Sequence, residues 1–133
     1  MLFWCHENLK EQLNVSSLHD IVHHNKMMVS YNPSETDFFG DVMGYVEFSP
    51  YININKSVRY PTWIMSSCVG AVHASTINLL NNKLATKNGF DYFLNSIAKL
   101  AMPKGLICYS DPNLLLNNDT SIILPKATKK QLF

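Results

Sequence analysis

The stretch of sequence that decides the fold runs from Arg59 to Asn113 and reads RYPTWIMSSCVGAVHASTINLLNNKLATKNGFDYFLNSIAKLAMPKGLICYSDPN. Its clearest feature is a set of apolar side chains that recur every three or four residues before Pro103. This spacing places them on one face of an α-helix, so residues 90–101 are predicted to be helical. The apolar run after the helix predicts a strand near residues 105–109.

The segments on either side of this helix complete an α/β pattern. Residues 74–82 have apolar side chains at helical spacing, and residues 64–70 are apolar and small, which is typical of a strand. Toward the N-terminus, residues 8–25 are predicted to be mainly helical and residues 26–31 to form a strand. A break of the helix near Asn14 stays open, because Ser17 and Asp20 offer a local N-cap with an acidic first turn. With a further strand at 42–48, the predicted fold class is α/β, a small mixed sheet with flanking helices.

Composition limits the classes of function. The chain has 133 residues, 47% of them apolar, which suits one domain over residues 1–133 with a flexible tail at 123–133. The formal net charge is +1 and Arg59 is the single arginine, so we expect no nucleic-acid partner. Because no apolar stretch approaches the ~20 residues that a bilayer requires, no membrane span is predicted.

The cysteines indicate a reducing compartment. Cys5, Cys68 and Cys108 are an odd number at wide spacing, which fits neither a disulfide framework nor a zinc ribbon. Cys68 and Cys108 lie in apolar runs and are predicted to be buried free thiols. The expected localisation is cytoplasmic.

Two other patterns were weighed as sites. His19 and His23 are four residues apart on the predicted helix, but no third metal ligand is evident, so a polar helix face is favoured and no metal site is predicted. Ser66 and Cys68 precede His73 without the G-x-S-x-G elbow of a hydrolase. The small residues around them more simply allow a strand to pass close to its neighbour.

Asp91 is the most informative carboxylate. It stands at the start of the strongest predicted helix, where an acidic side chain caps the helix or pairs with its dipole. Its functional alternative is a base that deprotonates an acceptor hydroxyl. The sequence favours the structural role but leaves both open.

Several segments occur in an order that is known from a family. Asp91 follows a small-residue segment and precedes Tyr109 and Pro112, and Asp119-Thr120-Ser121-Ile122 comes last. The small-residue segment reads Gly70-Ala71-Val72-His73-Ala74-Ser75-Thr76-Ile77-Asn78-Leu79-Leu80, and upstream of it stands Glu35-Thr36-Asp37-Phe38-Phe39-Gly40. Over residues 30–122 this order resembles the family 25 glycosyltransferases, the lipooligosaccharide and procollagen-type galactosyltransferases.

The resemblance implies the acceptor-side, C-terminal part of an A-type glycosyltransferase fold. The implied reaction is transfer of a sugar from a nucleotide sugar to a hydroxyl of a glycan or a protein. Asp91 would then be the catalytic base, and Trp63, Tyr60 and Asp37 would bind the acceptor substrate.

The resemblance also implies that the chain is incomplete or inactive alone. The family holds a divalent metal, Mn or Mg, with a Glu-Asp-Asp sequence at a strand end, against the sugar diphosphate. The corresponding place here is Trp4-Cys5-His6-Glu7, in which only Glu7 is acidic. A metal cofactor is therefore expected only if a complete site is supplied elsewhere. The expected partners are a glycan acceptor and either a missing N-terminal half or a second copy of the chain.

Two non-enzymatic readings stay open beside this one. The first is a small protein-interaction module that uses the aromatic side chains of Tyr45, Phe48, Tyr51 and Tyr60. The second is a small structural protein of a virus or phage. The surroundings of Asp91 discriminate the transferase from the interaction module, since an acceptor base must face an open cleft.

Overall fold

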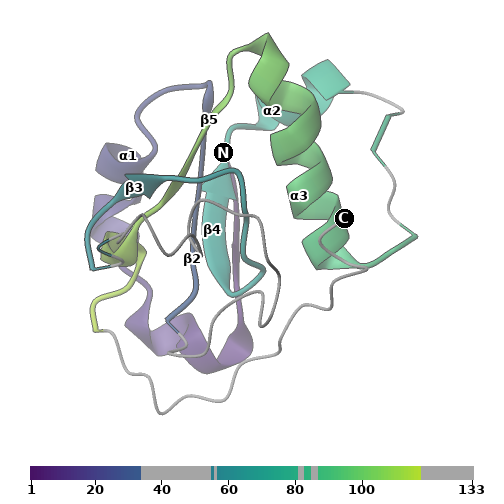
Figure 1. The fold of residues 1–133 in the computed structure, drawn as a ribbon. Helices are drawn as coiled ribbons and strands as arrows, with labels where there is room; N and C mark the ends of the chain where they lie inside the picture. Colours follow the sequence, from purple (N-terminus) through teal and green to yellow (C-terminus); the bar gives the residue numbers. More distant parts are fainter. Residues whose placement is uncertain (34–54, 56, 81–82, 85–86, 118–133) are drawn as a thin grey trace.

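The computed structural model describes residues 1–33, 55, 57–80, 83–84 and 87–117. Their strands form one five-stranded mixed sheet in the order β1-β4-β2-β5-β3 (Figure 1). The strands are β1 (Leu2–Cys5), β2 (Met27–Tyr31), β3 (Tyr60–Pro61), β4 (Val69–Val72) and β5 (Ile107–Ser110). A mixed sheet with flanking helices confirms the predicted α/β class.

The sheet is mixed because one of its four pairings is parallel. β4 runs antiparallel to both β1 and β2, β2 runs parallel to β5, and β3 runs antiparallel to β5. Every residue of β2 and β4 is buried, as expected for interior strands that are covered on both faces. The carboxyl ends of β2 and β5 therefore meet at one edge of the sheet, and their amino ends meet at the opposite edge.

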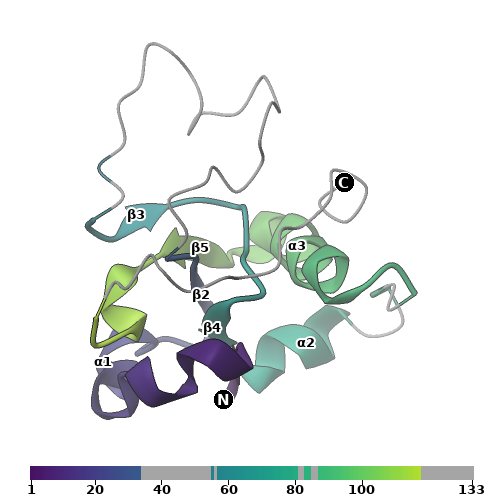
Figure 2. The same ribbon diagram turned by 90° about the horizontal axis from the view of Figure 1, so that it is seen from below.

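Helices cover both faces of the sheet (Figures 1 and 2). One face packs against α2 (Ala74–Leu80) and α3 (Phe90–Ala101), which continues into the 3₁₀ turn η4 (Met102–Lys104). The other face packs against the short helical turns η1 (Glu7–Gln12), α1 (Leu18–Ile21) and η5 (Pro112–Leu114). A further turn, η2 (Val15–Ser17), links η1 to α1 and buries none of its residues.

The alternation of side chains along β2 divides the core between these two faces. Met28 belongs to the cluster under α3, whereas Met27, Val29 and Tyr31 belong to the cluster under α1. Among the described residues, no helix has the length and apolar character that crossing a membrane requires.

Several predicted elements are confirmed. The helix α3 has the predicted bounds, α2 lies within the predicted 74–82, β2 lies within one residue of its predicted strand, and β5 lies within two residues of its own. Cys68 and Cys108 are buried and free, as predicted. Gly105 follows η4 with a φ of 92°, a left-handed conformation that explains why the chain turns sharply there.

A continuous helix over residues 8–25 is wrong, whereas the break near Asn14 is present and separates η1 from η2. Leu9, Leu18 and Ile21 are buried as their spacing suggested, but they lie on separate short turns. The cause is a long-range contact: Leu13 pairs with Leu115 in an isolated β-bridge, and the amide of Asn14 donates to the carbonyl of Leu114 at 2.9 Å. These bonds hold the backbone extended where a continuous helix would have to pass.

The strand predicted over residues 64–70 is correct only from Val69 onward. The backbone N–H groups of residues 64–68 donate to side chains instead of a strand partner. The predicted strand 42–48 and the predicted tail 123–133 lie outside the described residues, as do Glu35–Gly40 and Asp119–Ile122.

Gly70 confirms the prediction that small residues allow a close approach. A Cβ atom at this position would overlap the indole ring of Trp4 and the carbonyl oxygen of Val29. Trp4 on β1 is the cross-strand partner of Gly70 on β4, and its indole ring lies over the glycine. The glycine therefore makes room for a large aromatic side chain on the α2–α3 face of the sheet.

Candidate functional site

The candidate site is built where α3 meets the irregular segment between β3 and β4. Asn95 of α3 is 4% exposed, and its side-chain amide pairs with the backbone of Met65. Its Oδ1 accepts from the N–H of Met65 at 3.0 Å, and its Nδ2 donates to the carbonyl of the same residue at 3.0 Å. The same Nδ2 also donates to the carbonyl of Asp91 at 2.9 Å. The Asn95 side chain thus satisfies both backbone hydrogen-bonding groups of Met65, which a neighbouring strand would otherwise satisfy.

The residues that follow Met65 are held in a similar way. The hydroxyl of Ser30 accepts from the N–H of Ser66 at 2.9 Å, and the indole N–H of Trp4 donates to the carbonyl of Ser66, also at 2.9 Å. The hydroxyl of Ser66 in turn accepts from the N–H of Cys68 at 3.1 Å. These contacts give Ser66 a structural role. Among the described residues, no histidine forms a hydrogen bond with its hydroxyl, as the base of a hydrolase would.

Asp91 lies in the first turn of α3, but it does not occupy the N-cap position. That position belongs to Gly89, which has a φ of 95° and no side chain to offer. The Asp91 carboxylate is half-buried and accepts from the N–H of Ser67 at 3.3 Å. It therefore joins the helix start to the segment before β4, while its charge is favourably placed near the positive end of the helix dipole.

A groove of about 600 Å³ lies beside α3. One stripe of the helix lines it, together with η4 and the segment before β4, and the surface is mostly apolar. The described residues that line it are Trp63, Tyr92, Asn95, Ser96, Lys99, Met102 and Pro103. The size and the lining resemble those of small-molecule sites, which are concave and apolar with a few polar groups.

Of the predicted site residues that the structure describes, one lines the groove and two do not. Trp63 lines the groove, and Asp91 stands one helical turn before Asn95, which also lines it. Tyr60 lies in β3, where it pairs with Ser110 of β5. Neither Tyr60 nor Asp91 is among the described residues that line the groove. Asp37 lies outside the described residues.

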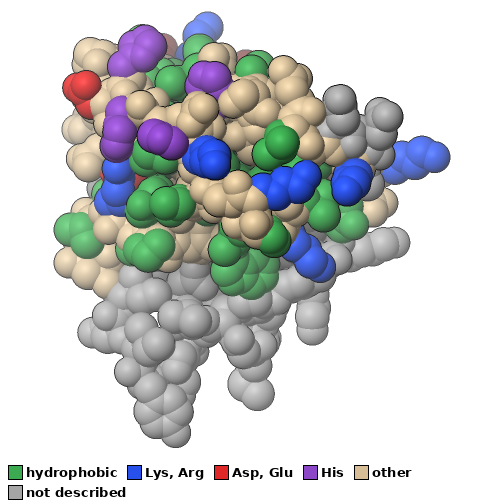
Figure 3. Space-filling view, turned by 90° about the horizontal axis from the view of Figure 1, so that it is seen from above, with side chains coloured by type: hydrophobic (Ala, Val, Ile, Leu, Met, Phe, Trp, Pro, Cys, Tyr) green, Lys and Arg blue, Asp and Glu red, His purple; other side chains and the backbone are tan. Residues whose placement is uncertain are grey.

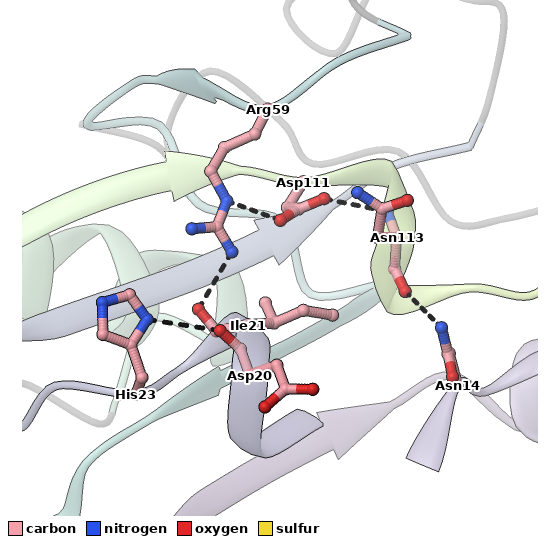
Figure 4. Close-up of polar contacts among 7 residues, drawn as sticks. All are labelled: Asn14, Asp20, Ile21, His23, Arg59, Asp111 and Asn113. Atoms are coloured by element: carbon pink, nitrogen blue, oxygen red, sulfur yellow. Dashed lines mark hydrogen bonds and ion pairs between the residues drawn. The ribbon is translucent and has the colours of Figure 1, made fainter. Parts of the chain in front are cut away.

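A second polar centre, which the sequence analysis did not single out, joins Arg59 to Asp111 (Figure 4). Arg59 Nε lies 2.6 Å from the Asp111 carboxylate, and its Nη2 donates to the carbonyl of Ile21 at 2.9 Å. The guanidinium also lies over the ring of Tyr109, 5.4 Å from its centroid. Asp111 is 1% exposed and also accepts from the N–H of Asn113 at 2.9 Å.

Two signals in the sequence could have pointed to this centre. Arg59 is the chain's single arginine, and Asp111 directly follows the apolar strand at 107–110. A carboxylate that follows an apolar strand and becomes buried requires a partner, and arginine is the side chain best suited to supply one. The Arg59–Asp111 pair lies at the edge of the sheet where β2 and β5 end.

Burial determines the protonation of the thiols. It raises the pKa of the Cys108 thiol from its ordinary value of 9.0 to about 12. Burial also raises the pKa of Cys68, against an opposing contribution from the hydrogen bond with Ser66. Both thiols are therefore protonated near neutral pH and do not present a thiolate nucleophile.

The histidines do not assemble a metal centre in the described part of the chain. His19 lies within α1, but His23 lies beyond its end, and Nδ1 of His23 is 3.2 Å from the carbonyl oxygen of Asp20. Among the described residues, no three His, Cys, Asp or Glu side chains are grouped so that they could hold a metal ion.

Comparisons of the chain with protein-family models, with curated proteins and with solved structures found no match.

Proposed function

We propose that the groove beside α3 binds a carbohydrate acceptor, and that the chain is the acceptor-side part of a glycosyltransferase-like protein. The observation that carries the proposal is the lining of the groove, in which Trp63 and Tyr92 stand beside polar side chains. The apolar face of a sugar ring packs against aromatic rings, and its hydroxyls require polar partners nearby.

The polar groups of the groove are not equally available to a ligand. The amide of Asn95 is engaged with Met65 and Asp91, and the hydroxyl of Ser96 donates to the carbonyl of Tyr92 at 2.7 Å. Lys99 is exposed and has no hydrogen bond with another described residue. The Lys99 ammonium and the Tyr92 hydroxyl are thus the groups that would meet the hydroxyls of an acceptor.

Asp91 is the residue that we assign as the base. One carboxylate oxygen is fixed by the N–H of Ser67, and the other has no hydrogen bond within the described residues. A general base requires this arrangement, in which one lone pair orients the group and another takes the proton. The assignment requires an acceptor that extends from the groove to the start of α3.

We expect the isolated chain to bind an acceptor but not to transfer sugar. The diphosphate of a nucleotide sugar requires a metal or a cationic clamp, and the single arginine is already paired with Asp111. Each 1.36 kcal/mol of lost transition-state stabilisation is about a tenfold loss of rate. Turnover of a nucleotide sugar with manganese by the purified chain, abolished in Asp91→Asn, would refute the expected inactivity while supporting the assigned base.

Binding is the direct test. Saturation-transfer NMR with a panel of mono- and disaccharides should detect contacts that Trp63→Ala removes. Phe3→Ala is the matched control, because Phe3 is an exposed aromatic residue on β1 and does not line the groove. Equal signals from the two variants, or no signal from any sugar, would remove the carbohydrate assignment.

The exposed edge of the sheet favours a second candidate, a protein-interaction module. β1 pairs with β4 on one side only within the described residues, and Leu2 and Phe3 on this strand are 48% and 58% exposed. An edge strand with apolar side chains can add a strand from another protein or from a second copy. Light scattering that shows a dimer of the wild-type chain but a monomer of Phe3→Lys would support this candidate.

A further inference from the structure

A second cavity lies at the opposite edge of the sheet from the Arg59–Asp111 pair. It is about 170 Å³ in volume and is formed where β2, β5 and α2 begin and α3 ends. The described residues that line it are Asn25, Lys26, Ser75, Thr76, Leu79, Ala101, Lys104 and Leu106. No carboxylate is among them.

Two lysines dominate the charge of this cavity. Lys26 and Lys104 are exposed, and neither forms an ion pair with another described residue. The same end of the molecule shows lysine and histidine side chains gathered together, with few acidic side chains among them (Figure 3). The described lining of the cavity thus carries two lysines and no carboxylate, which favours a negatively charged ligand.

Backbone contacts bring together the chain segments that carry these lysines. The N–H of Ile107 donates to the carbonyl of Lys26 at 2.9 Å, which ties the start of β2 to the start of β5. Gly105 turns the chain between Lys104 and β5, and a Cβ atom at Gly105 would lie 3.5 Å from Nζ of Lys26. The ammonium of Lys26 thus lies beside the turn that carries Lys104.

A hydrogen bond from α2 closes the third side of the cavity. The buried hydroxyl of Thr76 donates to the carbonyl of Asn25 at 3.2 Å, so the start of the helix is fixed against the residue before Lys26. Ser75, which is exposed, adds a hydroxyl within 2.7 Å of Nδ1 of His73. The lining therefore includes Asn25, Ser75 and Thr76 beside the two lysines, and each hydroxyl oxygen can still accept or share a hydrogen bond.

We propose that this cavity binds a phosphate group. A phosphomonoester carries close to two negative charges and three acceptor oxygens, which match two ammonium groups and neighbouring hydroxyls. A single carboxylate would neutralise only one of the lysines. The volume holds a tetrahedral oxyanion with some water, since one water occupies about 30 Å³ of liquid. The proposal is independent of the carbohydrate groove, which shares none of these lining residues.

The primary test is a titration of the full chain with inorganic phosphate, followed by ¹⁵N–¹H NMR at constant ionic strength. The amides of Lys26, Ser75 and Gly105 should shift and saturate. Lys26→Gln and Lys104→Gln should each weaken the fitted affinity about tenfold, because each removes one charge-assisted contact. The matched controls are Lys10→Gln and Lys87→Gln, which remove exposed lysines that do not line the cavity.

A second measurement identifies the source of the phosphate. Co-sedimentation with phosphatidylcholine vesicles that contain phosphatidic acid, lost in Lys26→Gln/Lys104→Gln, would assign the site to a lipid headgroup. Saturable binding of inorganic phosphate without vesicle binding would assign it to a soluble phosphate. Shifts that do not saturate, or that are the same in the double variant and in the wild type, would overturn the proposal. All four lysines are exposed, so each variant should fold, and its NMR spectrum verifies that it does.

Discussion

Arg59 and Asp111 form a pair in which the anion is buried and the cation reaches the surface. The Asp111 side chain is 2% exposed and that of Arg59 is 31% exposed, with 2.6 Å between Arg59 Nε and the carboxylate. The guanidinium also donates to the carbonyl of Ile21 at the end of α1. The Arg59 side chain therefore neutralises the buried charge of Asp111 and also joins the edge of the sheet to α1.

Replacing Arg59 should be costly because Asp111 would lose its counter-charge. Removing one partner of a buried pair costs about 3–5 kcal/mol, and we expect about 3 kcal/mol for Arg59→Met since Arg59 is partly exposed. Urea unfolding measures the change. In Asp111→Asn the side-chain oxygen can still accept from the N–H of Asn113, so Arg59→Met should cost much less in that background. Equal costs in the two backgrounds would contradict the coupling.

Asn95 should be essential to the fold although it lies in the groove. Asn95→Ala leaves the N–H and the carbonyl of Met65 unpaired, and Met65 is fully buried. Two unsatisfied buried groups should lower the free energy of unfolding by about 3 kcal/mol. The neighbouring Ser96→Ala is the control, expected within about 0.5 kcal/mol of the wild type. Similar stabilities for the two variants would mean that water replaces the amide.

Two of the described glycines, Gly70 and Gly105, should respond differently to alanine. Gly70→Ala places a methyl group against Trp4 and the carbonyl of Val29, and overpacking of this kind costs about 1–3 kcal/mol. At Gly105 there is space, so Gly105→Ala should cost only about 1 kcal/mol for the positive φ. Thermal unfolding of the two variants tests this order. A shift of Trp4 fluorescence in Gly70→Ala alone would locate the strain.

The protein should lose stability in alkali through Cys108. Its thiol ionises near 9.0 when exposed, but burial raises its pKa to about 12 in the folded state. Above pH 9 the unfolded chain releases this proton first, so the unfolding free energy falls by up to about 1.4 kcal/mol per pH unit until the folded thiol also ionises. Below pH 9 this contribution is constant.

The control for this prediction is Cys108→Ala measured at the same pH values. Its lower starting stability is a packing effect and does not vary with pH. The difference in slope between wild type and variant from pH 9 to pH 10.5 isolates the thiol from Cys68, Tyr31 and the lysines. Parallel curves would show that Cys108 does not contribute.

The sequence predicts local elements well where one signal dominates. In α3 the apolar stripe and the Pro103 stop agree, and the helix has the predicted bounds. Residues 8–25 have the apolar spacing of a helix as well, but the bonds of Leu13 and Asn14 to the far end of the described chain outweigh it. Local periodicity carries no information about such partners.

The candidate site also combines a residue that the sequence predicts with contacts that it does not predict. Trp63, which the family resemblance singles out as a binding residue, does line a groove. The pairing of Asn95 with Met65 and that of Arg59 with Asp111 span 30 and 52 residues. Each depends on how the sheet brings its edges together, which no spacing along the chain reveals.

The side-chain anchoring of the segment before β4 has a consequence for the order of assembly. The N–H groups of Met65 and Ser67 donate to side chains of α3, and that of Ser66 donates to a side chain of β2. None of the three donates to a partner strand. Such amides cannot gain protection from solvent exchange until those distant elements have docked. In a pulse-labelling experiment they should become protected after the helical amides of α3, and so report completion of the tertiary structure.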